Sequence, residues 1–357
     1  MDDTTTTVRA SIDVGLEPAA AFAVFGEELA AALAVMGIRF EAGPRGHVTA
    51  GEVTVGRVVA WEPGARMGLE WRAADWQTDE VTRVELRFEP ANGGTRVTAE
   101  HHGWGRVIGD AGELTGWFAG QVVAPLLRAT TPAAFGDWLT DRGARRPSGA
   151  RARGVYRDPL YHYPNFRVIL AELALTADDY LLEVGCGGGA LLKDALESGC
   201  RAAAVDHSAD MVHLARETNR DAVARQRLAV VRAGAEWLPF ADGTFTRAAM
   251  TGVLGFLRDP VAALKEIHRV LRSGGKLVVL GADPELRGTP GAPEPMASRL
   301  AFYDSGELER LGRDAGFEDV HVVRRDLEPF AREVGVPEEH VPLFGGPGAR
   351  FLIARKT

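Results

Sequence analysis

The chain has 357 residues, 46% of them hydrophobic and 25% charged, and a net charge of −8. This length predicts two domains, the ordinary apolar share excludes a wholly disordered chain, and the acidic balance argues against nucleic-acid binding. No apolar run reaches the ~20 residues of a membrane helix, no signal peptide is apparent, and two cysteines are too few for a disulfide framework or a zinc site, so we expect a cytoplasmic protein that binds neither membrane nor metal.

Charge and tryptophan are distributed unevenly along the chain. Residues 1–140 hold 11 basic and 19 acidic residues, and therefore all of the net negative charge, together with six of the seven tryptophans. Residues 141–154 are rich in Gly, Pro and Arg, a composition typical of a linker. We therefore predict a first domain over 1–140, a linker over 141–154 and a second domain over 155–357.

The first domain is predicted to combine strands with helices. A helix is expected to begin at Pro18, because proline fits the first helical turn, and another helical pattern follows residue 112. Alternating apolar residues and turn signals predict strands over residues 8–14, 51–61, 66–71, 81–88 and 95–101.

The sequence of this domain resembles the START-like (SRPBCC) helix-grip family, in its Hsp90-ATPase-activator-homology branch. The resemblance is carried by GRVVAWEPGARMGLEW (56–71), FEPANGGTRVT (88–98) and the closing HGW (102–104). It implies an α+β helix-grip domain, in which an antiparallel sheet surrounds a long C-terminal helix, often with an apolar cavity. Members of this family bind hydrophobic small molecules, act as cyclases or interact with partner proteins, and the sequence does not choose among these roles.

The second domain begins with the plan of a nucleotide-binding βαβ unit. The apolar strand Tyr180–Val184 leads into a glycine-rich turn, then a helix, and then a second strand that ends at Asp206. The spacing Gly185-x-Gly187-x-x-Ala also fits a loose dinucleotide fingerprint, so the turn alone leaves two ligand classes open. Glu183 favours S-adenosylmethionine, because a carboxylate beside the turn repels a pyrophosphate and attracts an ammonium group.

Several spaced motifs of this domain are similar to class I S-adenosylmethionine-dependent methyltransferases of the UbiE/Methyltransf_11 type. They are EVGCGGG (183–189), DHSADM (206–211), LPFADGTF (238–245) and VAALKEIHRVLRSGGKLVVL (261–280). The resemblance covers about residues 155–357. It implies an α/β Rossmann-like fold, with a seven-stranded doubly wound sheet whose last strand is antiparallel.

The resemblance also implies a cofactor site for S-adenosylmethionine. The glycines would pass under the methionyl and ribose parts, the first acid would orient the ammonium group and the second would bind the ribose hydroxyls. Two further positions would pack near the adenine, and a threonine would line the methionyl end. The implied residues are Glu183, Gly185, Gly187, Gly189, Asp206, Met211, Ala235, Glu236 and Thr251. For Met211, ordinary helix packing is an equal alternative.

Two departures from the family pattern affect individual residues. Gly234 stands where the family usually has an acid that contacts the adenine amino group, and Thr246 stands where an Asp is common. A His that the family often has after the fourth strand is also absent.

The segment before the glycine turn is unusually aromatic. In relatives it caps the cofactor site, so Tyr156, Tyr161 and Tyr163 are candidate substrate contacts, and His162 is a candidate general base for an acceptor that must lose a proton. An aromatic cap packed on the sheet is the alternative. Tyr303, which precedes a predicted helix, is a further candidate at the entrance. The Pro/Gly-rich segments 283–300 and 329–349 are expected to form loops.

Three functions follow from these observations. We expect methyl transfer from S-adenosylmethionine to a small-molecule acceptor, in specialised biosynthesis, with the first domain aiding substrate binding or assembly. The first alternative is a nicotinamide-dependent oxidoreductase. The second is a non-catalytic binding or chaperone-partner protein with a degenerate methyltransferase domain, which the missing acid at Gly234 keeps open. The sequence does not determine which atom of the acceptor is methylated. It also does not determine whether the protein forms a homo-oligomer.

Overall fold

A computed structural model describes residues 7–34, 37–72, 81–103, 120, 123–124, 128, 132–346 and 348–357. The contacts of the chain divide it into two compact units, Met1–Trp138 and Leu139–Thr357. Most of the helical segment expected after residue 112, and with it the long helix implied for the first domain, lies outside the described residues. So does Trp104, the last residue of the first domain's motif.

The first unit is built on one antiparallel sheet with strand order β1-β7-β6-β5-β4-β3-β2. The predicted strands and the helix at Pro18 are confirmed, and the structure adds the short strands β2 and β3. The elements are β1 (Val8–Val14), α1 (Pro18–Ala34), β2 (Ile38–Phe40), β3 (His47–Ala50), β4 (Val53–Glu62), β5 (Arg66–Trp71), β6 (Thr82–Ala91) and β7 (Gly94–His102). Helix α4 (Pro132–Thr140) crosses the boundary between the two units.

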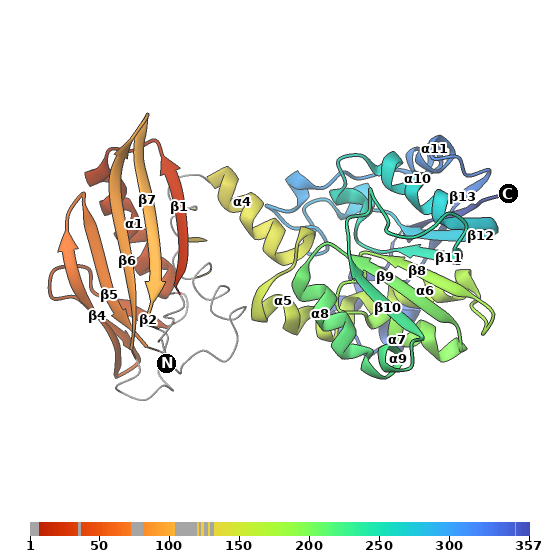
Figure 1. Ribbon diagram of the computed structural model, residues 1–357, viewed down its shortest axis with the longest axis horizontal. Coiled ribbons are helices and arrows are strands. Elements are labelled where there is room, and N and C mark those ends of the chain that lie inside the picture. Colours follow the sequence, from red (N-terminus) through yellow and green to blue (C-terminus); the bar gives the residue numbers. More distant parts are fainter. Residues whose placement is uncertain are drawn as a thin grey trace. The chain divides into compact units, whose positions relative to one another are not determined.

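Helix α1 covers one face of this sheet (Figure 1). Its residues Phe22, Phe25, Leu29 and Leu33 recur at helical spacing and are all buried against inward-facing strand residues. Burial of one apolar stripe explains why a segment with many alanines forms a stable helix here.

The second unit is an α/β unit with many short connecting helices. Its elements are η3 (Asp141–Arg145), α5 (Gly149–Arg157), η4 (Leu160–His162), α6 (Tyr163–Leu173), β8 (Tyr180–Val184), α7 (Ala190–Ala195), η5 (Leu196–Ser198), β9 (Arg201–Asp206), α8 (Ala209–Thr218), α9 (Arg220–Ala224), β10 (Leu228–Arg232), β11 (Phe245–Met250), η6 (Leu254–Phe256), α10 (Pro260–Val270), β12 (Leu271–Leu280), η7 (Pro284–Leu286), η8 (Ala297–Arg299), α11 (Ser305–Asp314), β13 (Asp319–Arg325), α12 (Glu328–Glu333), η9 (Glu338–Phe344) and β14 (Ala349–Arg355).

Its seven strands form one sheet with order β10-β9-β8-β11-β12-β14-β13, and β14 runs antiparallel to both of its neighbours. Helices α6, α7 and α8 pack on one face, while α10 and α11 pack on the other (Figure 1). The predicted doubly wound fold is confirmed. The strand order reverses between β8 and β11, and in such sheets ligands bind outside the carboxyl ends of the strands at this switch point.

The segment predicted as a linker is not irregular. Residues 141–145 form a π-helical turn, and α5 begins at Gly149. Ala152 on α5 is buried against Met211 and Leu214 of α8, so packing on α8 stabilises a helix that composition alone does not favour. The helical segment therefore belongs to the second unit.

The glycines of the 261–280 motif do not end helix α10. With Asp259 as its N-cap, α10 ends at Val270, before Gly274. Leu271 is already extended and pairs with Phe245 of β11, so strand pairing begins before the glycines. The predicted loop 329–349 also contains most of α12 and all of η9.

Candidate active site

A glycine-rich turn connects β8 to α7 at the switch point of the second sheet. Gly185, Gly187 and Gly189 have φ values of +77°, +49° and +79°, a region that side chains other than glycine rarely adopt. The turn is tied to the neighbouring strand, because the amide of Gly185 donates to Val205 O over 2.8 Å. The three predicted cofactor glycines thus form one tight turn beside the carboxyl ends of β8 and β9.

Two buried carboxylates flank this turn. Asp206, at the end of β9, accepts hydrogen bonds from the amides of Gly187 over 3.0 Å and Ser208 over 2.8 Å. Glu183, on β8, is 2% exposed, and its Oε2 has no hydrogen-bond partner within the described part of the chain. Burial, and then the nearby charge of Asp206, raise the pKa of Glu183 well above its ordinary value. Burial also raises the pKa of Asp206, against the opposing effect of its two backbone hydrogen bonds.

Thr251 follows β11, the other strand at the switch point. Its Oγ1 is buried and, among the described residues, has no hydrogen-bond partner. Met250 pairs with Val184, which places Thr251 next to the start of the glycine turn. Two neighbouring strand ends therefore present unsatisfied polar atoms, Glu183 Oε2 and Thr251 Oγ1. A ligand with an ammonium group would provide the carboxylate with a hydrogen-bond partner of opposite charge. S-adenosylmethionine carries such a group.

The end of α5 lies over the glycine turn. A Cβ placed on Gly187 would lie 2.9 Å from the ring of Tyr156, and a Cβ on Gly188 would collide with the backbone of Tyr156. Burial, reinforced by Asp206, raises the pKa of Tyr156 to about 12. Tyr156 is thus the aromatic residue of this segment that the structure brings to the predicted cofactor site.

The other aromatic candidates of the segment pack on different neighbours. Tyr161 is 45% exposed, its hydroxyl is 2.7 Å from Nδ1 of His340, and its ring stacks on Phe344. His162 stacks on Phe166 with ring centroids 6.1 Å apart, and burial lowers its pKa.

Tyr163 packs edge-to-face on the same Phe166, and burial raises the pKa of Tyr163 to about 12. Within the described residues, no hydrogen bond or ring contact joins Tyr161, His162 or Tyr163 to the glycine turn.

The remaining candidates occupy three different environments. Met211 is fully buried with Ala152 and Leu214, so its contacts are those of helix packing. Ala235 is partly buried beside the sheet, Glu236 is exposed, and the amide of Tyr303 donates to Ala282 O over 2.9 Å.

Three residues near the turn were not singled out from the sequence. Ser208 caps α8, and its hydroxyl donates to Pro147 O, which ties the segment before α5 to α8. The capping pattern of Ser208 was a usable signal. Val253 lies against Gly185, and Asn219 donates to Gly189 O, but neither residue type carries a sequence signal for such a contact.

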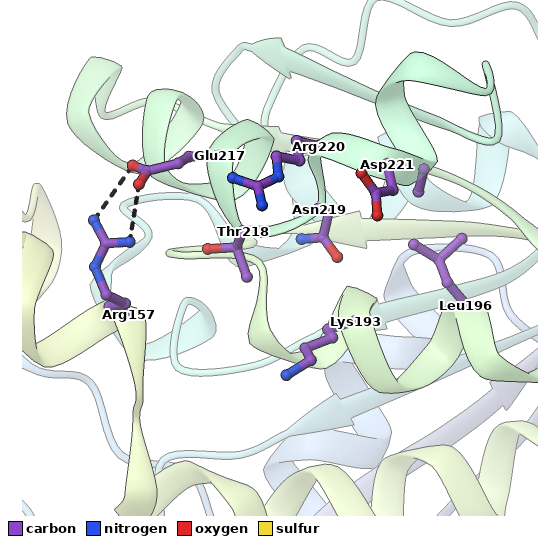
Figure 2. A pocket seen from close by; sticks show the side chains of 9 residues that line it. Arg157, Lys193, Leu196, Glu217, Thr218, Asn219, Arg220 and Asp221 are labelled. Carbon is purple, nitrogen blue, oxygen red and sulfur yellow. Dashed lines mark hydrogen bonds and ion pairs between the residues drawn. The ribbon is translucent and has the colours of Figure 1, made fainter.

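A separate pocket of about 450 Å³ is lined by residues from α5, α7, η5 and the segment from α8 to α9 (Figure 2). None of the predicted site residues lines it. Its three cations face two carboxylates, and Arg157 already pairs with Glu217 through contacts of 3.0 and 3.3 Å. The lining residues are Arg157, Lys193, Leu196, Glu217, Thr218, Asn219, Arg220, Asp221 and Ala222.

The described residues include no helix long and apolar enough to cross a membrane. They also include no group of three or more His, Cys, Asp or Glu side chains placed to hold a metal ion.

The two units match different protein families. Residues 182–279 match the family described as "Methyltransferase domain", and residues 27–119 match "Activator of Hsp90 ATPase homolog 1-like protein".

Curated methyltransferases are similar to part of the chain. The chain is 34% identical over 197 residues to demethylmenaquinone methyltransferase of Lactiplantibacillus plantarum, a match covering 47% of this chain and 83% of that relative. It is 32% identical over 175 residues to O-methyltransferase resE of Aspergillus sclerotiorum, covering 46% of this chain and 66% of that enzyme. A solved S-adenosylmethionine-dependent methyltransferase from Aquifex aeolicus is 20% identical, with a TM-score of 0.45 over 57% of this chain and 97% of the other.

With its doubly wound sheet and its glycine turn between two buried acids, the chain belongs to the class I S-adenosylmethionine-dependent methyltransferases. It carries in addition an N-terminal domain of the Hsp90-ATPase-activator-like, START-like type. The oxidoreductase and the non-catalytic alternatives gain no support from these comparisons.

Proposed function

We propose that S-adenosylmethionine binds across the carboxyl ends of β8, β9 and β11. The observation that carries this placement is Glu183, a buried carboxylate without a hydrogen-bond partner among the described residues, beside a turn of left-handed glycines. Glu183 would pair with the methionyl ammonium group, Asp206 with the ribose hydroxyls, and Thr251 with the methionyl end. Ala235 and Glu236 would flank the adenine.

The proposed acceptor is a small organic molecule. The relative from L. plantarum is named for a quinone precursor, and the one from A. sclerotiorum for methylation of oxygen. Both names are consistent with a small acceptor in biosynthesis. We propose that Tyr156 and Tyr303, and more distantly Tyr161 and Tyr163, contribute to the acceptor side, and that the N-terminal domain aids substrate binding or assembly.

The protein's part in the reaction is mainly positioning. When bound, S-adenosylmethionine supplies an electrophilic methyl group. The residues around the turn orient it, and the end of α5 excludes water from it, so that a nucleophile can be held in line at about 3–3.5 Å. A general base is required only if the acceptor loses a proton, and His162 is then the proposed base, because its lowered pKa keeps the imidazole neutral.

A binding titration tests the placement of the cofactor. Calorimetry with S-adenosylmethionine, S-adenosylhomocysteine and NADH should show binding of the two sulfur ligands alone. Asp206→Ala should abolish that binding, since it removes the ribose partner. It also removes an acceptor for the Gly187 amide, so a circular dichroism melt must first show that the variant is folded. Unchanged affinity in folded Asp206→Ala contradicts the proposed site.

A further inference from the structure

Asn219 occupies the corner between α8 and α9. It is 6% exposed, it follows the last residue of α8, and its backbone amide donates to Ala215 O over 3.1 Å. Its backbone carbonyl accepts from Val223 N over 3.1 Å, which starts α9. The backbone of Asn219 is therefore satisfied by the helices, and its side chain is available for another contact.

The side chain of Asn219 links the glycine turn to helix α8. The Nδ2 group of Asn219 donates to Gly189 O over 2.9 Å and to Ala215 O over 3.0 Å. These two carbonyls belong to different elements, the turn and helix α8. Because one planar amide holds both, it fixes the distance between the turn and the helix.

Gly189 is shaped to receive this contact. Its φ is +79°, and a Cβ at this position would lie 2.6 Å from Asn219 Nδ2 and 3.0 Å from Ala215 Cα. The carbonyl of Gly189 also accepts from the amide of Lys193 over 3.2 Å, the first hydrogen bond of α7. The same oxygen therefore starts helix α7 and anchors the turn to α8.

The turn is held from two sides. Asp206 accepts from the amide of Gly187 at the end of β9, while Asn219 donates to the carbonyl of Gly189 at the end of α8. Asp206 is also the proposed ribose partner, so its carboxylate serves two groups when cofactor is bound. Asn219 has no proposed contact with the cofactor. Its hydrogen bond to Gly189 O can therefore hold the turn whether or not cofactor is present.

We propose that Asn219 is a positioning residue, which preorganises the glycine turn for S-adenosylmethionine by holding the Gly189 carbonyl. The inference rests on the proposed placement of the cofactor on this turn. Preorganisation reduces the ordering that binding must otherwise supply. Loss of Asn219 should therefore weaken cofactor binding and loosen the turn in the empty protein.

Full-length Asn219→Ala is compared with Thr218→Ala, a matched control one residue away. The Thr218 hydroxyl is buried in the same pocket and has no hydrogen-bond partner in the described part of the chain. Hydrogen exchange of the peptide covering residues 186–192 is followed without cofactor, and the Kd for S-adenosylhomocysteine is measured by calorimetry. Asn219→Ala loses the hydrogen bonds to Gly189 O and Ala215 O, and we expect roughly tenfold faster exchange and a roughly tenfold higher Kd from loss of the buried bond to the turn. Thr218→Ala should match the wild type in both.

Asn219→Asp provides a readout that a general packing defect would not give. A carboxylate at this position faces two carbonyl oxygens, whereas the protonated acid can donate one hydrogen bond. The ratio of its Kd to that of the wild type should therefore fall as the pH is lowered. Dividing by the wild-type value at each pH removes the titration of Glu183 and Asp206, which both proteins share.

Equal exchange and equal Kd in Asn219→Ala and Thr218→Ala would overturn the inference. The inference would also be overturned if the ratio of the Asn219→Asp Kd to the wild-type Kd did not change with pH. This second test remains decisive if Asn219→Ala does not fold. A wild-type protein that binds no S-adenosylhomocysteine refutes the proposed cofactor placement, and with it the role in cofactor binding. Hydrogen exchange would then separate a turn that Asn219 holds from one that it does not.

Discussion

We expect Glu183 to have opposite effects on the stability of the empty protein and on ligand binding. The end of a central strand is a poor environment for a carboxylate, since both faces of the sheet are covered and no described group donates a hydrogen bond to Oε2. An ammonium-bearing ligand would remove the conflict. The same side chain should therefore destabilise the empty protein and strengthen binding.

Replacing Glu183 tests both effects. The folded chain holds the Glu183 proton more tightly than the unfolded chain does, so wild-type stability falls as the pH rises above the ordinary value of 4.5. Glu183→Gln has no ionisable group at this position, so its stability should not fall with pH in this way. We expect urea unfolding to show that the variant gains stability relative to the wild type as the pH is raised from about pH 5 to about pH 8.

Cofactor binding should show the opposite preference. The affinity of the wild type for S-adenosylhomocysteine should rise as the pH increases through that range and Glu183 loses its proton, and the affinity of Glu183→Gln should stay low and flat. Equal pH profiles for the two proteins would show that Glu183 does not face the ammonium group.

His162 allows a second test on a single residue. His162→Phe keeps a ring stacked on Phe166 and removes the imidazole nitrogen. If the acceptor must lose a proton, we expect kcat to fall at least about 100-fold, with the unfolding midpoint and cofactor affinity unchanged. Retention of kcat with such an acceptor would assign His162 to packing on Phe166. The Kd for S-adenosylhomocysteine serves as the control.

At the scale of elements, the close contact between the end of α5 and the glycine turn is central. A Cβ on Gly188 would lie 2.8 Å from Tyr156 C and 2.9 Å from Leu214 Cδ2, and both neighbours are held by packing on α8. Backbone contact this close leaves no space for a side chain. The glycines of this turn therefore serve the docking of α5 as well as the ligand.

A pair of glycine substitutions separates these contacts from backbone flexibility. Gly188→Ala should destabilise the second unit by about 1–3 kcal/mol, because α5 must move away. Gly234→Ala is the matched control: no atom lies within 4 Å of its added Cβ, so it should be neutral or stabilise by up to about 1 kcal/mol. Equal unfolding free energies for the two variants would mean that α5 does not press on the turn.

Strong local signals mark the starts of some helices. The capping box of Asp304 and Glu307 starts α11, and Pro260 stands in the first turn of α10. Segments whose structure depends on distant partners were predicted less well. Helix α5 forms because Asp210 accepts from Gly149 N over 2.6 Å and because Ala152 is buried on α8, and neither partner is close to α5 in the sequence.

At the scale of the whole molecule, the two compact units make a clear prediction about unfolding. Six of the seven tryptophans lie in the first unit, whereas the proposed cofactor site lies entirely in the second. A ligand stabilises only the unit that binds it, by about 2.7 kcal/mol at 100 times its Kd. Saturating S-adenosylhomocysteine should therefore raise one calorimetric transition of the full chain and leave the tryptophan fluorescence midpoint unchanged. A common shift of both would show that the units unfold together.

The sequence by itself determined the class of protein and the position of the glycine turn at which we propose the cofactor binds. These follow from local patterns, since a glycine turn between a buried strand and a helix, and an acid at the end of the next strand, are set by neighbouring residues. Only the tertiary structure decided which side chains meet the turn. Tyr156, Val253 and Asn219 reach it from three different elements, while His162 and Tyr161 contact other residues, because such contacts depend on how distant helices pack on the sheet.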